Sequence, residues 1–285
     1  MASSMDIELA RTFLEIMHSG SFVQAAERLH VTQTTVTARV RTLEQVLDCQ
    51  LFERGRSGAR LTPDGERFVS YASTLVNTWN RAKADLSLPR GHTLRLSIGA
   101  ESSLWNPVLL QWLFWMNAHH PAIALRTVVT DASSLLTQVE NGALDAVLVH
   151  RPGYYAGLNV ELLIEEKLIF VRSRLQPEPF LFVDWGGNFG DQYNTAMPQP
   201  RHAALTFDFG PLALQYLLQA GGCGYFRKRA VERGQLERVP DSPEFTYPIF
   251  LVFGATPPPE LESALEGFRS VALTEYPSAP GMPDR

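Results

Sequence analysis

The most restrictive feature of the chain is a set of three short apolar helical patterns near its N-terminus, separated by two tight connections. Residues 6–18 place apolar side chains on one face of a helix, which ends before Gly20. Ser21 and Gln24 have the spacing of a capping box, so a second helix begins immediately afterwards. Thr32 is a suitable N-cap for a third helix. The pattern therefore predicts three helices packed around one small core.

The third helix is predicted to have two different faces. Apolar residues spaced by four, three and four positions form a buried stripe of Val36, Val40, Leu43 and Leu47. The opposite face has short side chains and one cation, from Thr34, Thr37, Ala38 and Arg41. Such a face allows a helix to lie close to base edges, where Gln33 and the threonines could hydrogen-bond to bases or phosphates. A solvated helix surface is the alternative interpretation.

Two short strands with a glycine-containing tip are predicted after the third helix. The first begins at Leu51, and the second ends at Leu61. Arginines on such a wing can enter a minor groove or bind phosphate. We therefore expect the DNA contacts to come from Thr32, Gln33, Thr34, Thr37 and Arg41 on the helix and from Arg54, Arg56 and Arg60 on the wing.

These residues resemble the DNA-binding signature of the LysR family of bacterial transcriptional regulators. The matching positions are Ala25, Ala26, Leu29, Thr32, Gln33, Val36, Leu43, Glu44, Leu51, Phe52, Arg54, Leu61, Thr62 and Gly65. Two positions depart from the family pattern, because Thr37 replaces the usual serine and Asp48 replaces the glycine that usually ends the recognition helix. Since Asp tolerates the left-handed backbone conformation, we expect the fold to survive at a small cost in stability. The resemblance implies a winged helix-turn-helix DNA-binding domain over residues 1–62.

A long helix is predicted to follow the wing, starting at Thr62 and Pro63. Its apolar residues alternate steps of four and three, the spacing of a coiled coil: Phe68, Ala72, Leu75, Trp79, Ala82 and Leu86. The corresponding helix of the family dimerises, so the resemblance implies dimerisation through Phe68, Ala72, Leu75 and Trp79. Packing of the same seam against its own chain is the alternative. A dimerisation helix and a hinge at Pro89–His92 would then occupy residues 63–92.

Strands and helices alternate from residue 93 onward, which predicts an α/β domain with a doubly wound parallel sheet. Strands are expected at 93–98, 122–129, 144–149, 167–172, 180–184, 223–226 and 246–253, and helices at 103–118, 132–141, 210–220 and 258–272. The resemblance to the LysR family continues more weakly here, at residues 142–145 and 207–224. It implies an all-α winged helix-turn-helix domain followed by an α/β two-lobed, periplasmic-binding-protein-like effector domain over residues 93–285.

Residues 102–105, 111–113 and 184–186 resemble a subgroup of the family that includes repressors of flagellar master operons. This resemblance concerns the apolar and aromatic stretches of the C-terminal part, around Trp105, Trp112 and Trp185.

Ligands of two-lobed sheet proteins bind at the carboxyl ends of the strands. The residues expected there are Ala100, Glu101, Ser102, Ser103, Ser133, His150 and Phe207. The three serines could equally act as helix caps. Glu101 would oppose a carboxylate ligand unless Arg151 or a helix end offsets it, so the sequence leaves the charge of the ligand open.

Charge and cysteine content restrict the environment of the chain. Residues 1–87 contain ten Lys/Arg and ten Asp/Glu, so the net charge of −5 falls on the remaining residues, and the N-terminal arginines cluster between positions 39 and 60. The two cysteines, Cys49 and Cys223, fit a reducing compartment and predict no disulfide framework or cysteine metal cluster. No signal-peptide pattern or long apolar run is present, so we expect a cytoplasmic protein that does not enter a membrane.

Three other classes of protein compete with this interpretation. A solute receptor for transport would not need the N-terminal winged pattern, and a redox sensor would need a second thiol near Cys223. An enzyme would need a catalytic constellation, and the sequence has no H-E-x-x-H, G-x-S-x-G, Walker loop or paired C-x-x-C motif. We therefore expect a sequence-specific DNA-binding regulator without enzymatic activity, metal or cofactor. Its expected partners are double-stranded operator DNA, a small-molecule effector, further copies of itself in a homodimer or homotetramer, and RNA polymerase.

Overall fold

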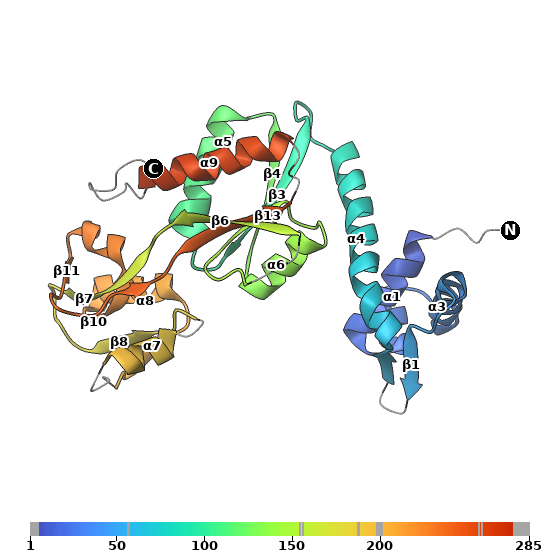
Figure 1. Ribbon diagram of the computed structural model, residues 1–285, viewed down its shortest axis with the longest axis horizontal. Helices are drawn as coiled ribbons and strands as arrows, with labels where there is room; N and C mark the ends of the chain where they lie inside the picture. The colour runs from blue at the N-terminus through green and yellow to red at the C-terminus, as the bar shows by residue number, and fades with distance from the viewer. Residues whose placement is uncertain are drawn as a thin grey trace. The chain divides into compact units, whose positions relative to one another are not determined.

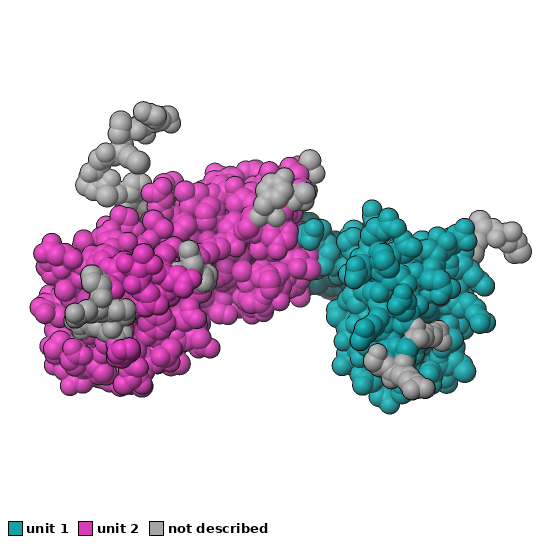
Figure 2. Space-filling view, turned by 60° about the horizontal axis from the view of Figure 1, so that its bottom comes forward, with its two compact units in different colours: residues 1–95, 140–144 teal, residues 96–139, 145–285 magenta. Residues whose placement is uncertain are grey.

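The structure is a computed structural model that describes residues 6–275 except 56–57, 154, 156, 187–188, 198–201, 256 and 258. The side chains of Arg54, Glu232, Arg233 and Glu275 are also outside the description. The chain divides into two compact units, coloured separately in Figure 2. Unit 1 comprises residues 1–95 and 140–144, and unit 2 comprises residues 96–139 and 145–285.

Unit 1 contains the predicted helices and wing (Figure 1). Its elements are α1 (Ile7–Ser19), α2 (Phe22–Arg28), α3 (Gln33–Leu47), β1 (Phe52–Gly55), β2 (Gly58–Leu61) and α4 (Pro63–Leu86). The hydroxyls of Ser21, Thr32 and Thr62 cap α2, α3 and α4, as expected. Asp48 ends α3 with φ 52° and ψ 38°, the left-handed conformation that the sequence predicts at this position.

The core of unit 1 lies between α1, α3, the wing and the first half of α4. Val36, Val40 and Leu43 are buried, whereas Leu47 is 36% exposed, so the predicted stripe of α3 stops one turn early. The ring of Phe13 lies 5.2 Å from that of Phe52 and 5.1 Å from that of Phe68, which joins the three layers.

Two residues of the family signature have a clear structural reason. The Oε1 atom of Glu44 accepts hydrogen bonds from the backbone N–H groups of Leu51, at 2.8 Å, and Phe52, at 3.4 Å. A Cβ at Gly65 would overlap the carbonyl oxygen of Leu51. Glu44 therefore binds the start of the wing to α3, and the missing side chain of Gly65 lets the start of the wing lie close to α4.

Unit 2 contains two mixed sheets, each the centre of a lobe. The first sheet has the order β4-β3-β5-β13-β6 and the second the order β11-β7-β10-β8-β9, with β12 paired to β7. The strands of the first lobe are β3 (Leu94–Glu101), β4 (Ile123–Thr130), β5 (Ala146–Val149), β6 (Leu158–Ile164) and β13 (Ile249–Gly254). Those of the second are β7 (Lys167–Ser173), β8 (Phe180–Val183), β9 (Leu205–Phe207), β10 (Cys223–Arg227), β11 (Leu236–Arg238) and β12 (Phe245–Thr246).

The expectation of a parallel sheet is wrong. β3 and β5 are parallel, as are β8 with β9 and β10, but β13 is antiparallel to β5 and β6, and β7 is antiparallel to β10. The reason is the path of the chain, which enters the second lobe from β6 and returns from it as β13. The two crossing segments touch, because the backbone N–H of Tyr247 donates to the carbonyl oxygen of Glu166 at 2.8 Å.

Helices cover both faces of the first sheet. Figure 1 shows α5 (Leu110–His119) and α9 (Pro259–Glu275) together on one side and α6 (Ala132–Glu140) on the other. Trp112 stacks on Phe268 at 4.6 Å and donates its indole N–H to the carbonyl oxygen of Ala264 at 2.9 Å. A π-helical turn, Trp105–Leu109, precedes α5. The second lobe contains α7 (Phe189–Ala196), α8 (Gly210–Ala220) and a 3-10 helix, Lys228–Arg233.

Candidate nucleic-acid interface and effector cavity

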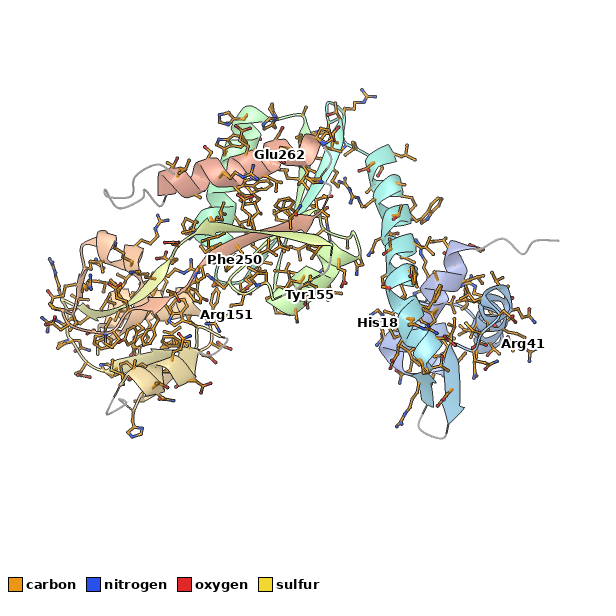
Figure 3. All side chains as sticks on the ribbon, viewed as in Figure 1. His18, Arg41, Arg151, Tyr155, Phe250 and Glu262 are labelled. Atoms are coloured by element: carbon orange, nitrogen blue, oxygen red, sulfur yellow. The ribbon has the colours of Figure 1, made fainter. Side chains whose placement is uncertain are left out.

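The outer face of α3 is a shallow hollow of mostly short or polar side chains. It is lined by Gln33, Thr34, Thr37, Ala38 and Arg41. Figure 3 shows Arg41 on the outer side of the helix, where the side chain is exposed and has no hydrogen bond or ion pair with any described residue. The prediction that this face points away from the core is confirmed.

The arginines that cluster in the sequence separate in the structure. Arg39 donates from Nη1 to the hydroxyl of Thr12 at 3.2 Å and lies 3.4 Å from Glu8, so it joins α3 to α1. Thr32 uses its hydroxyl mainly at the start of α3, where it accepts from the N–H of Thr35 at 3.2 Å. Arg41 therefore remains available for an external anion, while Arg39 and Thr32 have structural contacts.

The wing residues are described unequally. Arg60 is exposed on β2, and the backbone of Arg54 pairs with Ala59 across the hairpin. Arg56 lies outside the described residues, as does the side chain of Arg54. Their DNA contacts remain predictions.

The predicted dimerisation seam of α4 divides into two halves. Ala72 is fully buried and Phe68 packs on Phe13, so these two residues follow the alternative of packing within the chain. Leu75 and Trp79 are 44% and 47% exposed. Dimerisation through the second half of the seam remains a prediction.

Three of the predicted effector residues meet at the junction of the two lobes. The Oε1 atom of Glu101 accepts from the backbone N–H of His150 at 2.8 Å, and Nε2 of His150 lies 3.1 Å from the hydroxyl of Ser103. Arg227 from the second lobe donates to the carbonyl oxygen of Ser103 at 3.0 Å and to Nε2 of His150 at 3.2 Å. We call Glu101, Ser103, His150, Arg227 and Tyr247 the interlobe cluster.

The contacts of the interlobe cluster fix the protonation of His150. Because a guanidinium can only donate, Nε2 of His150 is the acceptor, and its Nδ1–H donates to the carbonyl oxygen of Pro248 at 2.9 Å. Burial, followed by the charge of Arg227, holds the pKa of His150 well below its usual value. The imidazole is therefore neutral, and its ring stacks on Tyr247 with centroids 3.7 Å apart.

Burial raises the pKa values of Glu101 and Tyr247, that of Tyr247 to about 12. The hydrogen bond from His150 and the charge of Arg227 act in the opposite direction on Glu101. Figure 3 places Arg151, another nearby cation, at the junction of the two sheets. The interlobe cluster is thus a set of buried and half-buried polar groups that join the ends of β3 and β5 of one lobe to the end of β10 of the other.

The other predicted effector residues lie apart from this cluster. Ala100 is buried within β3, and Ser102 is exposed. Ser133 is exposed at the start of α6, where its hydroxyl donates to Asp131 at 2.6 Å. Phe207 ends β9 with its ring 5.8 Å from that of Tyr216. The effector roles of these residues stay predictions.

A cavity of about 580 Å³ opens beside the interlobe cluster, with walls from both lobes. Ser103 is the one predicted effector residue in its lining. The sequence reasoning missed the other polar residues there, mainly Arg227 and Arg229, although two arginines directly after the strand at 223–226 were a usable signal.

The described helices include none with the length and apolar character needed to cross a membrane. Across the same described residues, no three His, Cys, Asp or Glu side chains gather in a way that could hold a metal ion.

Two family models match the chain. One is described as a bacterial regulatory helix-turn-helix protein of the lysR family and matches residues 7–66. The other is described as a LysR substrate binding domain and matches residues 89–272. Together they cover both compact units.

Relatives with full-length similarity agree with these matches. The HTH-type transcriptional regulator HdfR of Yersinia pestis (strain Pestoides F) is 33% identical over 266 residues, which are 87% of this chain and 90% of HdfR. The structure of CbnR complexed with its target DNA has a TM-score of 0.62 at 21% identity, covering 94% of this chain and all of CbnR. LysG of Corynebacterium glutamicum with bound effector Arg has a TM-score of 0.62 at 17% identity, covering 95% and 99%.

Proposed function

Since the chain belongs to the LysR family of bacterial regulatory helix-turn-helix proteins, we propose that it binds operator DNA through α3 and the wing. The second part of the proposal is that it responds to a small molecule bound between the lobes of unit 2. The observation that best supports DNA binding is the exposed face of α3, on which Arg41 has no partner among the described residues. CbnR, which has the same fold, has been solved with its target DNA.

The small side chains around Arg41 explain why this face suits a major groove. Thr34, Thr37 and Ala38 are short enough to let the backbone of α3 approach base edges. Gln33 can bond to an adenine edge or a phosphate, and Arg41 to a guanine edge or a phosphate. The arginines of the wing would add phosphate or minor-groove contacts next to the helix.

The experiment is a titration of labelled DNA from the region upstream of the chain's own gene, followed by fluorescence anisotropy at two salt concentrations. Because of the resemblance to flagellar master-operon repressors, the upstream region of such an operon is a second fragment. Arg41→Ala should lower the affinity roughly 5- to 150-fold if Arg41 reads a base, the equivalent of about 1–3 kcal/mol. Arg28→Ala removes the same charge from the exposed surface of α2 and should leave the affinity unchanged. Equal affinities of the parent and Arg41→Ala would refute the assignment of α3.

The assembly and the further partners follow from the same proposal. Two copies joined through the exposed half of the α4 seam would present two recognition helices to two half-sites, and a homotetramer would present four. Regulation of transcription requires that the protein either contacts RNA polymerase or excludes it from the DNA. A regulator that binds DNA would act in the bacterial cytoplasm, where the DNA lies.

The cavity beside the interlobe cluster is the best-supported effector site. It has walls from both lobes, so a ligand there would contact residues whose separation changes if the lobes move. LysG, which shares the fold, has been solved with a bound effector Arg. A ligand changes DNA binding only if its affinity differs between two arrangements of the protein.

A further inference from the structure

The lining of the effector cavity is mainly apolar and aromatic. Its side walls include Trp105 from the π-helical turn, Trp185 and Phe226 from the second lobe, and Phe209 with Leu214 at the start of α8. The cavity volume, about 580 Å³, falls within the range of pockets that bind small molecules. Aromatic walls of this kind can pack against a flat apolar ligand body.

The charge of the same lining is positive. Among the described residues that form it, Arg227 and Arg229 are cations, and none is Asp or Glu. Since the whole chain has a net charge of −5, this local excess of positive charge does not follow from its composition. A low-polarity cavity with cations on one side attracts a single anionic group more strongly than bulk water would allow.

Arg227 is equipped to bind such a group. Its two hydrogen-bond acceptors, the Ser103 carbonyl oxygen and the neutral His150 ring, have no charge to balance the guanidinium. No carboxylate of the described residues forms an ion pair with it, although Glu101 and Glu166 lie close enough for its charge to lower their pKa values. Its Nε is buried and has no hydrogen-bond acceptor among the described residues. Buried donors usually have acceptors, so this N–H can donate to a ligand that reaches it.

Glu101 lies near Arg227 but does not line this cavity. Its side chain is not part of the lining, and its Oε1 is directed to the backbone N–H of His150. A ligand carboxylate in the cavity would therefore not be in direct contact with the carboxylate of Glu101.

We propose that the cavity binds a flat, apolar carboxylate, with the carboxylate on Arg227 and the ring system against Trp105, Trp185 and Phe209. The proposal rests on the effector role proposed for the same cavity and names the class of that effector. A guanidinium can bind both carboxylate oxygens in parallel, which makes the contact selective for this group over a neutral amide of the same shape.

The test compares two ligands of nearly identical shape by isothermal titration calorimetry of the full chain: 1-naphthaleneacetate and its neutral amide. The parent should bind the acid at least 10-fold more tightly than the amide. Arg227→Gln should reduce this preference to less than 3-fold, because the variant loses the charge but keeps hydrogen-bonding capacity. Arg126→Gln makes the same change at an exposed position of β4 and should keep the full preference.

A second variant locates the site independently of Arg227. Leu212 lines the cavity but is 56% exposed, so Leu212→Trp should fold normally and narrow the entrance. Both ligands should then bind at least 5-fold more weakly. Equal binding of acid and amide by the parent, an unchanged preference in Arg227→Gln, unchanged binding in Leu212→Trp, or no binding of either ligand would each overturn the proposal. Operator binding, measured on the same samples, tests the proposed DNA-binding function separately, because that function stands if DNA is bound and the acid is not.

Discussion

Acidification should weaken unit 2 through His150, and replacement of this residue should remove that effect. In the folded protein the ring is buried, accepts from Arg227 and donates to Pro248, so a second proton would break the bond from Arg227 and place two cations side by side. Burial and the charge of Arg227 hold the folded pKa well below 6.5, whereas the unfolded chain titrates near 6.5. The unfolded state therefore takes up a proton that the folded state refuses.

The sign and size of the effect follow from proton linkage. A depressed folded pKa contributes stability that is present above the unfolded value and is lost as the pH falls below it. Between pH 7.5 and 5.5, a site with an unfolded pKa of 6.5 that stays neutral in the folded state costs about 1.4 kcal/mol of unfolding free energy. Glu101 and Glu166 act in the opposite direction, because burial raises their folded pKa values and protonation at lower pH then favours the folded state.

The assay is urea unfolding of the full chain at both pH values, followed by tryptophan fluorescence, for the parent and His150→Gln. Since the carboxylates and the other histidines are common to both proteins, the difference between their pH dependences isolates His150. The parent should lose about 1.4 kcal/mol more than the variant on acidification. His18→Gln, at an exposed position of α1 labelled in Figure 3, should behave like the parent. The same pH dependence in the parent and in His150→Gln would refute the assigned protonation state.

Two further predictions concern unit 1. Replacing both Leu75 and Trp79 by Glu should convert the assembly into monomers in light scattering, because these residues are the exposed half of the α4 seam. The control Val23→Glu, at an equally exposed apolar position, should keep the parent's mass. A parent-like mass of the double variant would contradict dimerisation through α4. Gly65→Ala should lower the unfolding free energy of unit 1 by about 1–3 kcal/mol in thermal or urea unfolding, because the new Cβ overlaps the backbone carbonyl oxygen of Leu51. An unchanged unfolding midpoint would contradict this and show that the wing can move away at no cost.

The local structure of unit 1 could be predicted because its signals lie within a few residues of each other. A cap such as Thr32 and the N–H group that it accepts from are three positions apart, and the left-handed conformation of Asp48 depends on its own backbone. The buried stripe of α3 needs only the period of a helix. The same periodicity wrongly predicted that Leu47 is buried, because a periodic pattern does not show where the neighbouring helices end.

The topology of unit 2 depended on pairings that no local pattern specifies. β6 was missed, along with α7, β9 and β11, and the return of the chain as β13 made both sheets mixed. A strand that leaves one lobe and another that comes back must run in opposite directions when they pair, and this requires knowledge of the crossing. Alternation of strands and helices alone favours the parallel arrangement.

The site was predicted in part for the same reason. Glu101, Ser103 and His150 follow strands of one sheet, so the rule that ligands bind at carboxyl strand ends brought them together. Arg227 comes from the other lobe, 124 positions after Ser103. Only the structure shows that its guanidinium reaches across and that the open cavity lies beside the cluster rather than within it.

The position of Arg227 connects ligand binding with the arrangement of the lobes. Its bonds to Ser103 and His150 join the lobes, and the same guanidinium is the cation proposed to bind a carboxylate. A carboxylate that accepts from Arg227 competes with these neutral acceptors, because it adds an opposite charge and two parallel acceptor oxygens that they lack. If the ligand replaces even one of the acceptors of Arg227 in the other lobe, it binds more tightly to the arrangement of the lobes in which that hydrogen bond is already absent. Each 10-fold difference in ligand affinity shifts the equilibrium between the two arrangements by about 1.4 kcal/mol. A ligand that leaves both bonds in place gains no such difference from Arg227, and it could then favour one arrangement only through its contacts with the walls from the two lobes.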